Sequence, residues 1–186
     1  MKPKILIPIA QGTEELEAVS LSDTLVRAGA EVVFASVEDQ LQVSASRGLI
    51  LTANRLITDA LTTTTWDLIL LPGGTEGAQR LGESAPLIQL LKQQFEAGRK
   101  VGAICADPAL VLSKNGFLEG HQATCYPSFA SQIDKAVYVD AKIVISGNLF
   151  TSQGPATALP FALELVNQLF GADKRQEVAA GMLVED

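Results

Sequence analysis

The sequence predicts an α/β fold on a mainly parallel sheet, with residues 1–186 forming a single domain. Length and composition suit this class, because 186 residues, 47% of them hydrophobic, can build a sizeable core and argue against disorder. Apolar stretches of strand length alternate with longer stretches of helical periodicity. The first strand, helix and strand form a βαβ unit, which implies parallel strands joined by a right-handed crossover.

This unit begins with Lys4–Ile9, an apolar run that predicts a buried strand. Residues 14–28 follow with apolar side chains at helical spacing, and Gly29 comes where a helix typically ends. Residues 31–37 form the second predicted strand of the unit.

The next segment predicts short strands within residues 40–54, around a turn at Ser46-Arg47-Gly48. Residues 62–65 are polar and predict a loop. Residues 67–71 predict a further buried strand, which closes on Pro72-Gly73-Gly74.

The second half of the chain again alternates between patterns typical of helices and of strands. Residues 86–97 predict a helix that ends near Gly98, and an apolar strand that begins at Lys100 runs directly into another helix. The remaining predictions are strands at 122–126, 137–139, 142–146 and Leu149–Ser152, and helices at 156–170 and 174–182.

Charge and residue usage disfavour several function classes. A net charge of -7 without a run of lysine or arginine disfavours binding to nucleic acid or to an anionic membrane. No apolar run approaches the roughly 18 residues of a membrane span, and acidic residues soon after the short apolar start disfavour a signal peptide. Two cysteines make no disulfide framework, which favours a reducing cytoplasm. One histidine and two distant cysteines make no zinc pattern, so we expect no metal and no cofactor.

Cys105 lies at the junction between the strand that begins at Lys100 and the helix predicted after it. It follows Ile104, the end of that strand, and ligands of open α/β sheets bind beyond the carboxyl ends of the strands. A sharp strand-to-helix turn holds a side chain out at this edge, as the nucleophile elbow does for serine in other α/β enzymes. The unpaired N–H groups and the dipole of the predicted helix would favour the reactive thiolate.

Glu17 shares the apolar face of the predicted helix 14–28 with Leu21 and Leu25. A carboxylate on such a face is unfavourable unless it is protonated or paired, and a buried neutral carboxyl can donate a hydrogen bond, here to a Cys105 thiolate. The alternative is a solvated acid in the first helical turn that complements the helix dipole. Periodicity alone leaves both interpretations open.

Gly73 and Gly74 form the second candidate site feature. Glycines after a strand can expose backbone N–H groups that bind an oxyanion. The same residues also fit an ordinary Pro-Gly-Gly turn, which is the more frequent meaning of this pattern.

Four segments occur in an order that is more specific than any one of them alone. They are Gln11-Gly12-Thr13-Glu14-Glu15-Leu16-Glu17, Leu70-Leu71-Pro72-Gly73-Gly74, Ala103-Ile104-Cys105-Ala106 and Thr151-Ser152-Gln153-Gly154-Pro155. The chain resembles the ThiJ/PfpI superfamily in these segments, within the subgroup of the parkinsonism-associated deglycase and the bacterial YajL-like proteins. The likeness extends from Lys4 to about Val184. It implies a flavodoxin-like three-layer sandwich with helices on both faces of the sheet, and a homodimer.

The resemblance also implies roles for individual residues. Cys105 would be the reactive cysteine and Glu17 its carboxylic partner. Gly74 and Ala106 match positions whose backbone N–H groups face the reaction centre, where they would bind an oxyanion or a sulfinate. Two further positions match arginines near the active site or the dimer interface of relatives: Arg27 and Arg47.

Relatives are credited with two kinds of chemistry. Their cysteine oxidises readily to a sulfinate, as an exposed thiol of low pKa does. They are also credited with glyoxalase or deglycase activity on methylglyoxal and its adducts, and with redox-dependent, chaperone-type protection.

Tyr126 stands where many relatives have a histidine. With an unperturbed pKa of about 10, tyrosine is a poor base near neutral pH, so we expect no strong hydrolytic or triad-type catalysis. The only histidine, His121, would point to the opposite face of the predicted strand, and we expect it to be solvated.

Asp107 stands where relatives carry glycine or alanine. It suits a helix start, as an N-cap before Pro108. It also places an anion close to the thiol, so we predict a higher pKa for Cys105 than a small neighbour would allow, and a lower one in Asp107→Ala.

Cys125 has two interpretations. It could act as a resolving thiol near Tyr126, or it could be a small buried hydrophobe, which is the commoner role of such a residue.

Other enzyme classes fit the sequence less well. A class I glutamine amidotransferase needs a histidine after its elbow cysteine, and none follows His121. The proteolytic branch of the superfamily has histidine directly after the nucleophile, where this chain has Ala106. A serine hydrolase would need a Gly-x-Ser-x-Gly elbow and a histidine base.

Two hypotheses remain, and both use the same residues. In the first, a redox-responsive protective protein, peroxide converts Cys105 to sulfenate and sulfinate. In the second, a cofactor-free enzyme for small reactive carbonyls, Cys105 attacks an aldehyde to give a hemithioacetal while Glu17 moves the proton. The missing histidine favours the first hypothesis.

Overall fold

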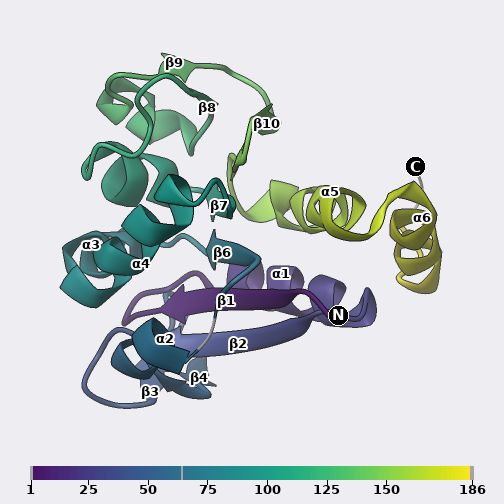
Figure 1. The fold of residues 1–186 in the computed structure, drawn as a ribbon, viewed down its shortest axis with the longest axis horizontal. Helices are drawn as coiled ribbons and strands as arrows, with labels where there is room; N and C mark the ends of the chain where they lie inside the picture. The colour runs from purple at the N-terminus through teal and green to yellow at the C-terminus, as the bar shows by residue number, and fades with distance from the viewer. Residues whose placement is uncertain (1, 64, 185–186) are drawn as a thin grey trace.

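The computed structural model describes residues 2–63 and 65–184. It has the predicted arrangement, a mainly parallel sheet with helices on both faces (Figure 1). Seven strands lie in the order β10-β11-β7-β6-β1-β2-β5. Strands β11, β7, β6, β1, β2 and β5 are parallel to their neighbours, and β10 is antiparallel to β11. The carboxyl ends of the central strands therefore meet at one edge, which carries the candidate site.

The strands of this sheet are β1 (Lys4–Ile9), β2 (Glu31–Ser36), β5 (Arg55–Leu56), β6 (Leu68–Leu71), β7 (Lys100–Ile104), β10 (Ile143–Ser146) and β11 (Leu149–Ser152). Two small sheets pair β3 (Gln42–Ser44) with β4 (Ile50–Thr52), and β8 (Gln122–Ala123) with β9 (Val137–Tyr138). The α-helices are α1 (Glu15–Arg27), α2 (Ile57–Thr63), α3 (Thr75–Glu83), α4 (Ala85–Glu96), α5 (Ala158–Phe170) and α6 (Ala172–Gly181). Among the described residues, no helix is both long enough and apolar enough to cross a membrane.

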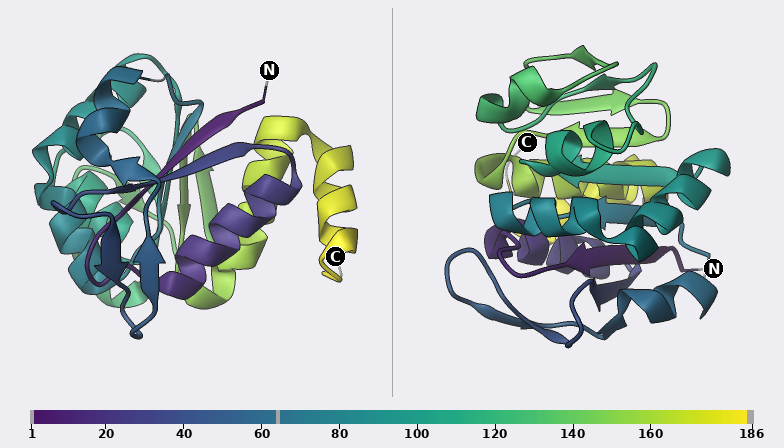
Figure 2. Two further views of the ribbon diagram at one scale, coloured as in Figure 1. Left: turned by 90° about the horizontal axis from the view of Figure 1, so that it is seen from below. Right: turned by 90° about the vertical axis from the view of Figure 1, so that its left-hand side faces the viewer.

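Helices cover both faces of the sheet (Figure 2, left). Alternate side chains of the strands belong to two separate cores, one on each face. Leu6 and Ile69 point to the face covered by α2, α3 and α4. Ile5 and Leu68 point to the face covered by α1, α5 and α6. Both faces of β1 and β6 are buried, which explains why these strands are continuous apolar runs rather than alternating ones.

Two helices were not predicted from the sequence. Helix α3 contains Gly77 and Gly82, which lower helix propensity, yet both are needed for packing. A Cβ at Gly77 would lie 2.8 Å from the backbone of Thr13, and one at Gly82 would collide with the carbonyl oxygen of Leu110. Helix α2 extends to Thr63, so the loop predicted at 62–65 is wrong for its first two residues, and Thr64 lies outside the described residues.

The segments around the site also differ from prediction. A π-helical turn, Pro108–Ser113, follows the junction in place of the predicted α-helix. The strand predicted at 122–126 stops at Ala123, because the Tyr126 N–H donates to the Cys105 carbonyl and Pro127–Gln132 then forms a 3₁₀ helix.

Candidate functional site

Cys105 follows β7 in a left-handed backbone conformation, with φ of +65°. A residue other than glycine pays roughly 1–2 kcal/mol for this conformation, so the surroundings must hold it. The Cys105 N–H donates to the Ser152 carbonyl over 3.0 Å, and its carbonyl accepts from the Tyr126 N–H over 2.7 Å. These two bonds fix the sharp turn and place the half-buried thiol at the carboxyl edge of the sheet.

The loop after β6 approaches Cys105 more closely than any residue with a side chain could. Gly73 and Gly74 both have positive φ, +73° and +89°. A Cβ at Gly73 would collide with Glu17 Oε2 and lie 2.7 Å from the Cys105 Cβ. The glycines therefore serve close approach at this edge as well as the turn itself.

Two backbone N–H groups face the sulfur, those of Gly74 and Ala106. Both donate toward Cys105 and so lower its pKa, because a donor stabilises the thiolate. The structure thus brings together the two backbone donors that the family resemblance implied.

Glu17 lies in the first turn of α1 and is fully buried beside Cys105, so the interpretation as a solvated acid is wrong. Burial, followed by the charges of Asp107 and Glu14, raises the pKa of Glu17 to about 9. The Cys105 thiol acts on this carboxyl as a donor, although neither oxygen has a partner of full hydrogen-bond geometry among the described residues. We regard the contact as a weak hydrogen bond, since each group shifts the pKa of the other. The acid is therefore neutral at neutral pH.

Cys105 is less acidic than the sequence suggested. Burial and then the charge of Glu17 raise its pKa to about 12, against the lowering effect of the two N–H donors. A six-residue π-turn also replaces the helix whose dipole was expected to lower this pKa. The two acids are coupled, so ionisation of either one makes ionisation of the other less favourable, and both hold their protons at neutral pH.

Asp107 stands at the predicted N-cap position before Pro108, but its side chain makes no capping hydrogen bond because it turns into the protein. It is fully buried, and its Oδ2 accepts from the Gly73 N–H over 2.7 Å. Its Oδ1 is buried without a hydrogen-bond partner among the described residues. Burial raises the pKa of Asp107 to about 7, and its charge raises the pKa of Cys105, in the direction predicted.

The thiol opens into a pocket of about 480 Å³ that other residues of the site complete. Tyr126 lines it and is 44% exposed, so the phenol stands where relatives have histidine. Thr75 and Ser128 also line it, and no pattern in the sequence indicates either residue. They come from α3 and from the 3₁₀ helix that begins at Pro127, elements that the sequence did not predict.

His121 and Cys125 lie away from this chemistry. The His121 Nδ1 atom is 3.1 Å from the Ser146 carbonyl oxygen, so the ring is half-buried against β10 rather than solvated. Cys125 is fully buried, and its thiol donates to the Tyr126 carbonyl over 3.4 Å. Burial raises the pKa of Cys125 to about 11, which suits a small buried hydrophobe better than a resolving thiol.

Arg27 and Arg47, the two arginines that the resemblance singled out, lie in different parts of the molecule. Arg47 lines the pocket, and its backbone N–H donates to the Glu15 carboxylate over 2.9 Å. Burial alone would raise the pKa of Glu15. The Arg47 N–H and the other N–H and hydroxyl donors outweigh burial, so the pKa of Glu15 lies below its usual value. Arg27 instead lies on the exposed side of α1, paired with Asp23 at 2.7 Å.

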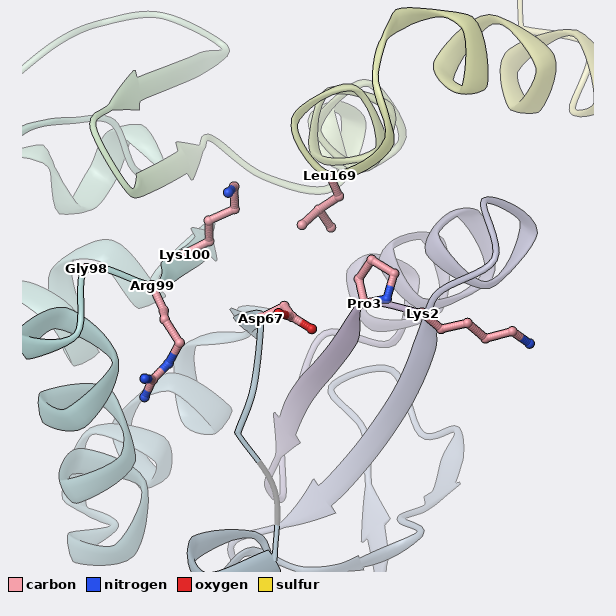
Figure 3. A pocket seen from close by; sticks show the side chains of 7 residues that line it. All are labelled: Lys2, Pro3, Asp67, Gly98, Arg99, Lys100 and Leu169. Atoms are coloured by element: carbon pink, nitrogen blue, oxygen red, sulfur yellow. The ribbon is translucent and has the colours of Figure 1, made fainter.

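A second pocket of about 360 Å³ lies at the amino ends of the strands, opposite the site (Figure 3). Its basic side chains diverge: Lys2, Arg99 and Lys100 point in three directions (Figure 3). It therefore offers no converging set of groups for a ligand. No cluster of three or more metal-ligating side chains occurs in residues 2–63 and 65–184.

Comparison with known proteins gives a consistent result. The sequence profile of the DJ-1/PfpI family matches residues 3–168. Protein DJ-1 homolog B of Arabidopsis thaliana is 42% identical over 98% of this chain, but the chain spans only 41% of that protein. Protein dj-1beta of Drosophila melanogaster is 39% identical, with 99% of this chain and 98% of its own length aligned. The glutathione-independent glyoxalase DJR-1.2 of Caenorhabditis elegans is 33% identical over 91% of this chain and 89% of its own.

Solved structures agree. Oxidized DJ-1 of Toxoplasma gondii superposes with a TM-score of 0.95 at 42% identity, covering 99% of this chain and 100% of that one. DJ-1beta of Drosophila melanogaster superposes with a TM-score of 0.96 at 37% identity, covering both chains completely. At these identities the likeness covers sequence as well as fold.

Proposed function

The chain belongs to the DJ-1/PfpI family, and on that premise we propose that it is a redox-responsive protective protein whose sensor is Cys105. The observation that carries this proposal is the full burial of the Glu17 carboxyl beside the Cys105 thiol, which raises the pKa of Glu17 to about 9 and so keeps it neutral. A neutral acid can donate a hydrogen bond to a negatively charged sulfur group. The N–H groups of Gly74 and Ala106 supply two more donors.

The oxidation proceeds in two balanced steps. The Cys105 sulfur attacks hydrogen peroxide and gives up its thiol proton to the site, a sulfur–oxygen bond forms and the oxygen–oxygen bond breaks, and the departing hydroxide takes a proton from the site to leave as water. A second peroxide repeats the exchange and converts the sulfenate to a sulfinate. Glu17 holds a proton beside both the attacking sulfur and the departing oxygen, so it suits the role of donor. A relative of 42% identity is described as oxidized DJ-1, which supports this interpretation.

Intact-mass spectrometry after mild peroxide tests the proposal. We expect a gain of about 32 Da, two oxygen atoms, that is absent in Cys105→Ser. Cys125→Ser is the matched control and should gain the same mass, because Cys125 is fully buried. A protein that stays at its original mass, or a gain that persists in Cys105→Ser, rejects the sensor.

A second candidate function is a glyoxalase. A relative of 33% identity is named a glutathione-independent glyoxalase, and the pocket at Cys105 holds about 480 Å³, ample for a three-carbon aldehyde. The thiol would add to the aldehyde carbon of methylglyoxal to give a hemithioacetal. Glu17 would carry the proton between the two carbons, and water would release lactate and the free thiol. Lactate formation above the level of Cys105→Ser would favour this function, and its absence eliminates it.

The proposal extends to assembly and location. A homodimer is supported by apolar side chains on the outer face of α1, where Leu16, Val19 and Val26 are each about half exposed. Leu49 and Ile50 continue this surface, since the Glu15 carboxylate joins the turn before β4 to the start of α1. Two free thiols are compatible with a reducing cytoplasm, which we propose as the location.

A further inference from the structure

We infer that Asp107 is a positioning residue whose carboxylate aims the Gly74 N–H group at the Cys105 sulfur. The inference rests on the proposed role of Cys105 as the reactive sulfur. A side chain outside the Gly73-Gly74 loop would then hold that loop in place.

The first step in the argument is the bond that crosses the site. The Gly73 N–H donates to Asp107 Oδ2 over 2.7 Å, a short distance typical of a bond to a charged acceptor. On the other side, the Gly73 carbonyl accepts from the Glu14 N–H over 3.1 Å. Gly73 is therefore held at both its N–H and its carbonyl.

The second step is the geometry of the peptide that follows. A trans peptide is planar, so its carbonyl and the next N–H point to opposite sides. The Gly73 carbonyl points to Glu14, and the Gly74 N–H consequently points the other way, to the Cys105 sulfur. The Glu14 N–H thus fixes the peptide that carries the Gly74 N–H, and the Asp107 carboxylate fixes the peptide before it, so the donor keeps its direction only while Gly73 is held on both sides.

The third step is that the flexible Gly73-Gly74 loop needs a restraint. Glycine has more backbone freedom than any other residue, and both Gly73 and Gly74 occupy the left-handed region. The second donor, Ala106, directly precedes Asp107 in the chain. One carboxylate therefore joins the segments of both donors, although Gly73 and Asp107 are 34 positions apart.

Electrostatics alone argues against an acid at this position. Asp107 is fully buried with one unpartnered oxygen among the described residues, which is unfavourable. The titratable groups that face it are acids: Glu17 from α1, with Glu14 behind it, and Cys105. Its charge raises the pKa of both Glu17 and Cys105, so its benefit to the site must come from the hydrogen bond to Gly73.

Two substitutions separate the bond from the charge. Asp107→Asn keeps an acceptor oxygen for the Gly73 N–H and removes the charge, whereas Asp107→Ala removes both. The readout is the rate of Cys105 alkylation by iodoacetamide, followed across pH by peptide mass spectrometry. Cys105→Ser supplies the blank, and Asp173→Asn, an exposed residue of α6 at the far end of the molecule, is the matched control for a lost charge (Figure 1).

We expect Asp107→Asn to react at least as fast as the wild type at every pH, because a like charge has gone and the donor is still aimed. Asp107→Ala should react about fivefold more slowly than Asp107→Asn, the ratio for one hydrogen bond of ordinary strength. The amide proton signal of Gly74 should move in Asp107→Ala and stay near its wild-type position in Asp107→Asn.

Equal rates in the two variants, or a slow Asp107→Asn, overturn the inference. Should Asp107→Ala not fold, Asp107→Ser takes its place, since its shorter side chain does not reach the Gly73 N–H. Alkylation needs no peroxide, so a protein that forms no sulfinate would reject the proposed function and leave this test readable.

Discussion

Glu17 and Asp107 are acids that the fold buries beside a thiol, and their protonation links the site to stability. Burial raises their pKa values, from 4.5 to about 9 and from 3.8 to about 7. An acid with a raised pKa in the folded state binds more protons folded than unfolded. Its contribution to stability is complete below the unfolded pKa and is lost as the pH rises through the folded one.

The wild-type protein should therefore melt at a lower temperature at pH 9 than at pH 5, because the unfolded chain has released both protons in that window while the folded protein holds them up to about pH 7 at Asp107 and about pH 9 at Glu17. Glu17→Gln keeps the volume of the side chain and should flatten this dependence, and Asp107→Asn should flatten its part below pH 8. Thermal unfolding followed by circular dichroism measures the effect, with Asp173→Asn as the exposed control. A Glu17→Gln profile parallel to that of the wild type would contradict the burial of a neutral acid.

At the scale of elements, α3 packs against the π-helical turn that follows Cys105 and so supports the turn at this residue. Gly82 of α3 meets the backbone of Leu110 in that turn, and the Asn115 side chain donates to the Gly82 carbonyl over 3.1 Å. The close contact leaves no room for a methyl group.

Gly82→Ala should therefore lower the free energy of unfolding by about 2 kcal/mol, since the helix must move away from the turn. Gly181→Ala is the matched control: nothing lies within 4 Å of its Cβ, and alanine at the end of α6 should be neutral or slightly stabilising. Urea unfolding with an unchanged m-value measures both. Equal midpoints for the two variants would show that α3 adapts without cost.

Local pattern explains which elements could be predicted. The β1-α1-β2 unit follows from apolar periodicity, whereas that periodicity left open whether Glu17, on the same face as Leu21, is buried or solvated. Asp107 before Pro108 has the pattern of an N-cap, but the carboxylate instead accepts from Gly73, a partner that no local pattern shows. The glycines of α3 lower its propensity and are required by tertiary contacts, so this helix and the pocket residue Thr75 were missed together.

At the scale of the whole molecule, the apolar face formed by α1 and the turn before β4 bears on assembly. If this face joins two copies, the protein should elute and scatter light as a particle of about twice 19.7 kDa. Val19→Arg places a charge in the middle of the face and should give a monomer. Val137→Arg, on an exposed residue of β9, should leave the dimer intact. A wild-type protein that remains a monomer at high concentration would reject the homodimer.

Cys105 touches both hydrophobic cores, a property that no other partly buried residue of the described chain shares. Elsewhere the sheet separates the two cores, and Cys105 lies at the edge of the sheet, where this separation ends. Because the thiol opens into the pocket, oxygen atoms added to the sulfur have space there while Cys105 keeps its packing against both layers. A covalent change at this one sulfur is therefore made on a residue that both layers of the molecule contact.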